Sequence, residues 1–212
     1  MRLREEVSQG SQIYINIFNC IYTDFKMVAA SVLPVAFHKG KLYFLFGKEN
    51  ELEDSAKGFS DFGGSVESGE TIMATALREG SEELSGFLGS PASVQKLIKK
   101  NGGHYKLVVN DYHIHMFSLD YDENLPKYFT NFHRFMWSKM DKHMLNSSKL
   151  FEKQEIRWFC ESDLKKSMKQ FRPFYRKMVQ EIIDNMSSIR SFVKKGSSRS
   201  TSNRKTMKMK GG

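Results

Sequence analysis

Three glutamates, Glu79, Glu82 and Glu83, lie close together in the sequence, with Arg78 beside them. Residues three and four apart on a helix share one face, so we expect these carboxylates to converge if the segment is helical. Clustered carboxylates repel one another and raise one another's pKa, which a bound cation relieves. Oxygen ligands favour Mg²⁺, Mn²⁺ or Ca²⁺ over zinc. The residue types and spacing therefore predict a divalent-metal site.

A glycine-rich stretch precedes the glutamates, with Gly63 and Gly64 at its start. Glycines allow backbone amides and carbonyls to come close to an ion or a phosphate. Thr71 is a suitable N-cap for a helix from Ile72 to about Leu84. The segment thus predicts a loop followed by a helix, an arrangement suited to a metal site that acts on a phosphate substrate.

The spacing of this segment resembles the Nudix box, G-x5-E-x7-R-E-U-x-E-E-x-G-U, where U is aliphatic. The fixed positions of the pattern are occupied by Gly64, Glu70, Arg78, Glu79, Glu82 and Glu83. Gly80 and Gly86 replace aliphatic residues, and Ser85 replaces the last glycine. We expect Gly80 to weaken the helix by about 1 kcal/mol relative to alanine and to leave a packing gap. Ser85-Gly86 resembles the terminating glycine displaced by one residue.

The Nudix resemblance implies an Mg²⁺- or Mn²⁺-dependent hydrolase with an α/β/α fold. Glu79 and Glu83 would bind metal directly, and Glu82 would bind a second ion or its water shell. The carbonyl of Gly64 would complete the site, and these glutamates would be catalytic. The Glu70–Arg78 pair would be a structural tie between loop and helix. The alternative interpretation is a solvated, glutamate-rich surface helix, which leaves the spacing of the glycines, Glu70 and Arg78 unexplained.

A second resemblance lies in the late segment Glu152–Leu164, EKQEIRWFCESDL. It is similar to the late strand and turn of many Nudix domains, including mRNA-decapping enzymes. The resemblance implies that Glu152 is a metal ligand or the general base that takes a proton from the attacking water. Glu155 is the nearby competitor, and either residue could be a surface charge. Lys48, at the end of a predicted strand, is a candidate phosphate ligand or a surface lysine.

The chain of 212 residues suits one domain with tails. Strand patterns in the regions 27–37 and 41–48 flank a turn at His38–Gly40, and a second predicted hairpin spans 104–120. Strands and helices interleave without a regular βαβ repeat, which predicts an α+β fold with a central mixed sheet between helices. We expect an N-terminal edge segment at 1–26, a Nudix domain at 27–186 and a basic disordered tail at 187–212.

The formal net charge is +9, and most of the excess lies at the C-terminus. From Asn185 to Gly212 there are eight Lys and Arg residues and no acids, which leaves 25 basic and 24 acidic residues elsewhere. The folded part is therefore not predicted to be a strongly basic nucleic-acid binder. The tail either contacts RNA phosphates or a membrane surface, or simply improves solubility.

The two cysteines, Cys20 and Cys160, lie far apart and indicate a reduced, intracellular protein. No segment has the roughly 20 consecutive apolar residues of a membrane span. We expect a cytoplasmic location. The Lys-, Asn-, Phe- and Met-rich character resembles Nudix hydrolases of giant DNA viruses, which implies host cytoplasm or virion.

The predicted reaction is hydrolysis of a pyrophosphate linkage in a nucleoside-diphosphate-linked substrate, with nucleotide or capped RNA as the partner. The mRNA 5′ cap is the leading specific substrate. A small-molecule Nudix enzyme, acting on nucleotide sugars, dinucleotides, damaged NTPs or inositol pyrophosphates, is the alternative. A catalytically silent Nudix-fold RNA-binding protein is the rival from another class. The sequence leaves the oligomeric state open.

Overall fold

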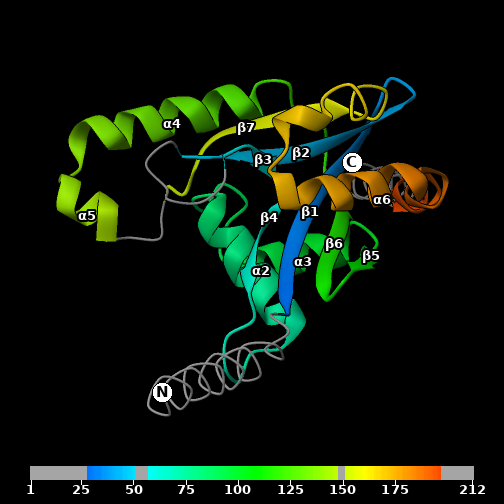
Figure 1. Cartoon of the computed structure of the whole chain (residues 1–212), viewed down its shortest axis with the longest axis horizontal. Coiled ribbons are helices and arrows are strands. Elements are labelled where there is room, and N and C mark those ends of the chain that lie inside the picture. The colour runs from blue at the N-terminus through cyan, green and yellow to red at the C-terminus, as the bar shows by residue number, and fades with distance from the viewer. Residues whose placement is uncertain (1–27, 51–56, 148–150, 197–212) are drawn as a thin grey trace, which may run out of the picture.

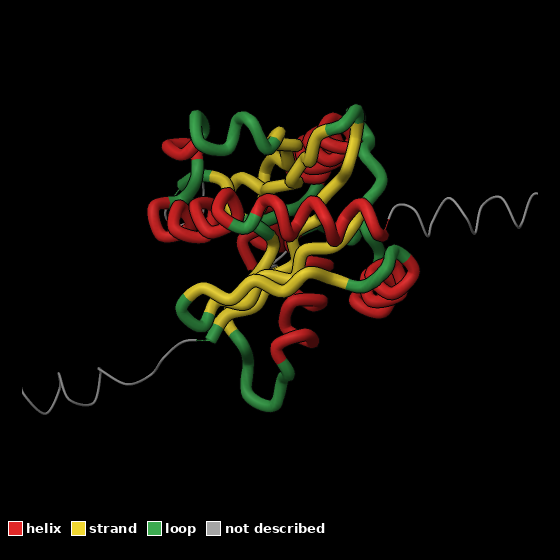
Figure 2. The backbone as a smooth tube through the Cα atoms, turned by 90° about the vertical axis from the view of Figure 1, so that its right-hand side faces the viewer, coloured by secondary structure: helices red, strands yellow, loops and turns green. Residues whose placement is uncertain are grey.

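The computed structural model describes residues 28–50, 57–147 and 151–196. These residues form a 7-stranded mixed sheet with helices on both faces (Figures 1 and 2). The strands are β1 (Ala29–His38), β2 (Lys41–Glu49), β3 (Phe59–Ser60), β4 (Phe62–Ser65), β5 (His104–Val109), β6 (Tyr112–Ser118) and β7 (Lys153–Cys160). Their main order is β3-β2-β1-β6-β5, with β4 paired to β1 and β7 paired to β2.

The helices pack on this sheet from two sides. They are α2 (Ile72–Glu83), α3 (Pro91–Lys100), α4 (Leu125–Lys139), α5 (Lys142–Ser147) and α6 (Arg176–Asp184), with 3₁₀ turns at Met168–Gln170 and Pro173–Tyr175. A further helix covers residues 186–196. In Figure 1, α4 runs beside β7, and α2 lies against β1 and β4.

Strand β1 is at the centre of the molecule because both its faces and both its edges are covered. It pairs in parallel with β6 and antiparallel with β2 and β4. Leu33 and Val35 point into a core closed by α6 and the 186–196 helix. Ala30 and Val32 point into a second core closed by α2, α3 and α4. This alternation produces the predicted α+β layering of helices, sheet and helices.

Both predicted hairpins are present. Lys39 and Gly40 connect β1 to β2 with φ angles of 46° and 81°. Asn110 and Asp111 connect β5 to β6 with φ angles of 47° and 59°. Two consecutive residues with positive φ form the tight turn that matches the twist of antiparallel strands.

The aromatic-rich segment that follows β6 forms the two helices α4 and α5. Of its aromatic residues, Phe129 is buried in the second core. Tyr128 and Phe135 are exposed instead, at 55% and 59%. The helix therefore places one aromatic side against the sheet and leaves another facing solvent.

The predicted domain boundary at residue 186 is too early. The helix over 186–196 buries Ile189 and Val193 completely in the first core. Arg190, which the sequence interpretation assigned to the tail, forms an ion pair with Glu161 and donates a hydrogen bond to the carbonyl of Gly40 (3.0 Å). The predicted edge segment 1–26 and residues 197–212 lie outside the described residues. Within the described ranges, no helix is long and apolar enough to cross a membrane.

Candidate functional site

The glycine-rich loop and α2 form one unit that sits on β1 and β4. Thr71 caps the helix, because its Oγ1 accepts a hydrogen bond from the amide of Ala74 (3.2 Å). The cap satisfies a backbone donor that would otherwise have no partner at the helix start. The helix then runs from Ile72 to Glu83, close to the predicted bounds.

Glu70 and Arg78 tie the loop to the middle of the helix. The guanidinium donates from Nε to Oε1 (2.8 Å) and from Nη2 to Oε2 (3.0 Å) of Glu70. Thr75 Oγ1 donates to the same carboxylate (2.7 Å). Hydrogen bonds from Arg78 and Thr75 lower the pKa of Glu70 to about 2. The loop conformation ahead of α2 is therefore fixed by a charged, two-point contact.

Glu79 and Glu82 also bind Arg78. Arg78 Nη1 lies 2.7 Å from Glu79 Oε1 and 3.4 Å from Glu82 Oε2. On the β4 side, Gly64 lies so close to Glu79 that an added Cβ would be 2.5 Å from Glu79 Oε1. Only glycine fits there without displacing the carboxylate, so the backbone of Gly64 and the side chain of Glu79 share one small space.

Glu83 is the buried member of the glutamate set. Its Oε2 accepts a hydrogen bond from the backbone N–H of Gly63 (2.8 Å), and its Oε1 lies 3.1 Å from Lys153 Nζ. Burial raises the pKa of Glu83 to about 8, with Lys153 opposing and the charges of Glu49 and Glu152 adding to the rise. A carboxylate in this environment is stabilised by any added positive charge.

Lys153, which the sequence interpretation did not single out, joins Glu83 to a second buried acid. Its Nζ forms an ion pair with Glu49 and donates to Ser60 Oγ (3.1 Å). Arg172 Nη1 also contacts Glu49 Oε1 (2.6 Å). Glu49 is the buried end of β2.

A register shift in the β2–β7 ladder directs Lys153 toward this acid. Lys48 pairs with Glu155, whereas its neighbour Glu49 pairs with Lys153, so Gln154 is the extra residue. Such bulges change which face a strand residue points to. No local pattern in the sequence indicates this shift, because it depends on how two distant strands pair.

The expected convergence of Glu79, Glu82 and Glu83 is not found. Arg78 binds the first two carboxylates, and Lys153 binds the third. Within the described part of the chain, no group of three or more His, Cys, Asp or Glu residues is arranged to hold a metal ion. The available ligand atoms are nevertheless of the type that a hard divalent cation prefers. They are the carboxylate oxygens of the glutamates, and the glycine backbone lies close beside them.

The remaining predicted residues differ in their environment. Glu152 directly precedes β7 and is near enough to Glu83 to raise the pKa of that carboxyl. Glu155 is bound by Arg157 instead (Nη2–Oε1 2.6 Å). Lys48 is half-buried in β2, opposite Phe59 and Glu155. The structure thus places Glu152 in the electrostatic environment of Glu83, whereas the Glu155 carboxylate is engaged by Arg157.

Asp61 is a further buried carboxyl beside the site. Burial raises its pKa to about 6, against the lowering effect of hydrogen bonds from Ser31 and Tyr112. Tyr112 Oη donates to Oδ1 (2.6 Å), and Ser31 donates to Oδ2. The hydroxyl of Tyr112 is therefore engaged with Asp61. The Asp61 contacts hold the β3–β4 corner, and hence Gly63, against β1 and β6.

Two of the three departures from the box have physical explanations that differ from those expected. Gly80 leaves no packing gap: an added Cβ would be 2.3 Å from Val32 Cγ2, so α2 lies directly on β1. Ser85 itself adopts the left-handed conformation that ends the helix, with a φ of 50°. The amide of Ser85 binds the carbonyl of Glu82 (2.8 Å), and that of Gly86 binds Ser81 (2.9 Å). The terminating position is therefore not displaced to Gly86.

Comparison of the sequence with protein-family models and with curated proteins finds no match. Among solved structures, C. elegans Ap4A hydrolase is similar at 14% identity and a TM-score of 0.43, over 76% of this chain and 98% of that one. The M. smegmatis Nudix hydrolase RenU is 12% identical with a TM-score of 0.42, over 77% and 88%. The Francisella tularensis bifunctional NMN adenylyltransferase/ADP ribose pyrophosphatase is 14% identical with a TM-score of 0.47, over 86% of this chain and 48% of that one. At these values the similarities do not identify a family.

Proposed function

We propose that this chain is a divalent-metal-dependent hydrolase of the Nudix type, which cleaves a pyrophosphate linkage in a substrate that contains a nucleoside diphosphate. The supporting observation is the unit formed by β4, the loop and α2. Gly64 closes on Glu79, the Gly63 amide binds Glu83, and Arg78 ties the loop to the helix. A helix that was only a solvated surface would require none of these contacts.

The cofactor in this proposal is Mg²⁺ or Mn²⁺, held by Glu79, Glu83, Glu82 and the carbonyl of Gly64. A bound divalent ion neutralises the diphosphate and lowers the pKa of the attacking water. The chain's own contribution is a set of carboxylates whose charges are balanced by Arg78 and Lys153.

Glu152 is the proposed general base. The charge of Glu152 contributes to the raised pKa of Glu83, whereas the competing Glu155 is engaged by Arg157. A base at this position would accept the proton of the attacking water. Lys48 remains a candidate phosphate ligand from the neighbouring strand.

The finer proposal is removal of the mRNA 5′ cap. It is supported by the resemblance of the Glu152–Leu164 segment to decapping-type enzymes and by the basic residues near the C-terminus. The alternative is hydrolysis of a small molecule such as a dinucleotide or a nucleotide sugar. The rival function is RNA binding without catalysis, which gives no reason for a buried acid such as Glu83 beside further carboxylates.

The test is a substrate panel of capped RNA, dinucleoside polyphosphates and nucleotide sugars, with Mg²⁺, with Mn²⁺ and with EDTA. We expect metal-dependent turnover that Glu83→Gln abolishes while the metal-free melting temperature is retained. Glu152→Gln should lower turnover by roughly 10²–10⁴-fold. Glu155→Gln, the matched control in the same segment, should have a mild effect.

The possible outcomes distinguish the hydrolase assignment, the choice of general base and the non-catalytic alternative. Near-normal turnover of Glu83→Gln would refute the hydrolase assignment. A severe effect of Glu155→Gln with a mild effect of Glu152→Gln would refute the assigned base and leave the hydrolase assignment intact. RNA binding without turnover of any substrate would favour the silent reading.

A further inference from the structure

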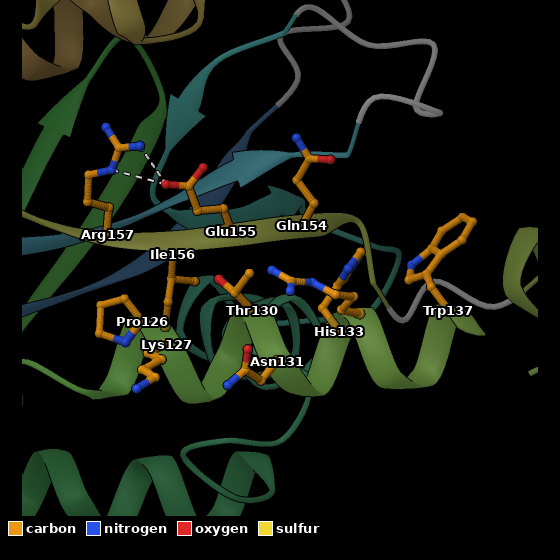
Figure 3. A pocket seen from close by; sticks show the side chains of 11 residues that line it. Pro126, Lys127, Thr130, Asn131, His133, Trp137, Gln154, Glu155, Ile156 and Arg157 are labelled. Atoms are coloured by element: carbon orange, nitrogen blue, oxygen red, sulfur yellow. Dashed lines mark hydrogen bonds and ion pairs between the residues drawn. The ribbon is translucent and has the colours of Figure 1, made fainter. Parts of the chain in front are cut away.

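A groove of about 630 Å³ lies between α4 and β7, away from the glutamates of α2. Its walls include Lys127, His133, Arg134 and Trp137 from the helix. Figure 3 shows the helix running along the strand, with His133 between the two elements and Trp137 at the far end. The volume is within the range of small-molecule sites, which run from roughly 300 to 1,000 Å³.

One end of the groove presents two flat aromatic rings. His133 and Trp137 stack with their centroids 5.7 Å apart and an interplanar angle of 29°. Trp137 Nε1 and His133 Nε2 are both buried without a hydrogen-bond partner among the described residues. A ligand with a planar ring would stack on these aromatic side chains. A nucleobase has this chemistry.

The charge of the groove is positive. Lys127 and Arg134 are exposed and have no ion pair or hydrogen bond within the described ranges. They are seven residues apart, so two helical turns bring them to the same side of α4. Arg157, on the opposite wall, is already neutralised by Glu155, and both side chains point away from the helix (Figure 3). The positive charges of Lys127 and Arg134 are suited to bind a phosphate group.

The aromatic end of the groove adjoins the segment that leads to the candidate catalytic residues. The His133 ring packs edge-on against Phe151, with centroids 5.8 Å apart. Phe151 immediately precedes Glu152 and Lys153, and the latter contacts Glu83. A ligand in the groove would therefore reach toward the carboxylates along the start of β7.

We propose that the groove between α4 and β7 binds a nucleotide unit of the substrate, with the base against His133 and Trp137 and the phosphate near Arg134 and Lys127. The identity of the occupant as part of the substrate rests on the proposed function. Occupancy of the groove itself does not, because a nucleoside monophosphate offers the same base and phosphate without a bond to hydrolyse.

The experiment measures binding of AMP and GMP to the full chain in EDTA. The chain has two tryptophans, so Trp158→Phe leaves Trp137 as the sole tryptophan whose fluorescence can be followed. We expect both nucleotides to quench its fluorescence, and inorganic phosphate alone to leave it unchanged. Trp158 Nε1 donates a hydrogen bond to the carbonyl of Asp122 (2.9 Å), so Trp158→Phe removes a contact. If the variant does not fold, calorimetry on the chain that retains Trp158 measures the same affinity.

Matched variants on the same helix locate the ligand. Trp137→Leu and Arg134→Met should each weaken AMP binding by about fivefold or more. Phe135→Leu and Lys139→Met, at exposed positions outside the groove, should leave it unchanged. A short single-stranded RNA serves as a competitor: tighter binding than AMP identifies an RNA strand as the source of the nucleotide, and equal binding identifies a small molecule.

Equal affinities in all four variants, or no binding of either nucleotide, would overturn the proposal. Groove binding without turnover of any diphosphate would refute the proposed reaction and leave the groove assignment standing. Turnover of a diphosphate substrate without nucleotide binding in the groove would refute the groove assignment and leave the proposed reaction standing.

Discussion

Two ion clusters adjoin the helix α2, and they are assembled in different ways. The Arg78 cluster consists of Arg78 with Glu70, Glu79 and Glu82. Its members come from one short stretch of sequence, and the Arg78 side chain is 21% exposed. The Lys153 cluster consists of Lys153 with Glu83, Glu49 and Arg172. Its members come from distant parts of the chain, and Lys153 is 1% exposed.

The comparison shows how far spacing determines a site. Short-range spacing along the loop and the helix places the Arg78 cluster, and water and salt screen its charges. The Lys153 cluster exists only after β2, β7 and α2 have packed, and its charges are balanced mainly by one another. Loss of a member should therefore cost little in the Arg78 cluster, whereas loss of Lys153, the cation that Glu83 and Glu49 share, should cost much.

The largest effect is expected from Lys153→Met. The substitution removes the cation that Glu83 and Glu49 share and leaves Glu49 with Arg172 alone, and breaking a buried ion pair in this way costs about 3–5 kcal/mol of unfolding free energy. Urea unfolding of the metal-free protein at neutral pH measures this loss. Added Mg²⁺ should raise the melting temperature of the variant more than that of the wild type, because the ion can replace the missing charge at Glu83.

Lys48→Met is the matched control for this change. Lys48 lies on the adjoining strand, half-buried, and its replacement should alter the unfolding free energy by no more than about 0.5 kcal/mol. Equal losses in the two variants would show that the Lys153 ion pairs contribute nothing specific.

A smaller effect, dependent on pH, is expected from Glu70→Gln. The folded-state pKa of Glu70 is about 2, below its ordinary value of 4.5. The unfolded chain therefore binds the proton first as the pH falls, so the stabilisation is complete above pH 4.5 and is lost toward pH 2. The difference in melting temperature between wild type and variant should shrink over that interval.

Salt distinguishes the two clusters further. At about 0.5 M NaCl the loss of stability caused by Glu70→Gln should diminish, whereas the loss of stability caused by Lys153→Met should persist. Glu67→Gln is the control, since Glu67 is 58% exposed and 3.7 Å from Arg78. A pH-independent difference between Glu70→Gln and wild type would contradict the proposed role of the carboxylate charge.

The sequence was informative where local geometry decides the outcome. The cap at Thr71, the two tight turns and the alternation of apolar residues along β1 follow from residue type and short-range spacing. The position of Lys153 does not, because it depends on a register shift between β2 and β7. Gly80 was also misread, since its missing side chain reflects the contact of α2 with Val32, which is distant in the sequence.

The smallest effect is expected at the end of α2, next to Glu83, where Ser85 adopts a φ of 50°. This conformation costs a residue with a side chain roughly 1–2 kcal/mol, and glycine adopts it freely but loses more entropy on folding. The Ser85 hydroxyl also has no hydrogen-bond partner among the described residues. Ser85→Gly should therefore raise the unfolding free energy by about 0.5–1 kcal/mol, measured by thermal and urea unfolding. Ser85→Ala removes the hydroxyl but keeps the strain, so it should stabilise the protein less. Equal stabilities of the two variants would mean that the helix end is unstrained, and that the serine at this position of the box has no energetic consequence for the backbone that holds Glu83.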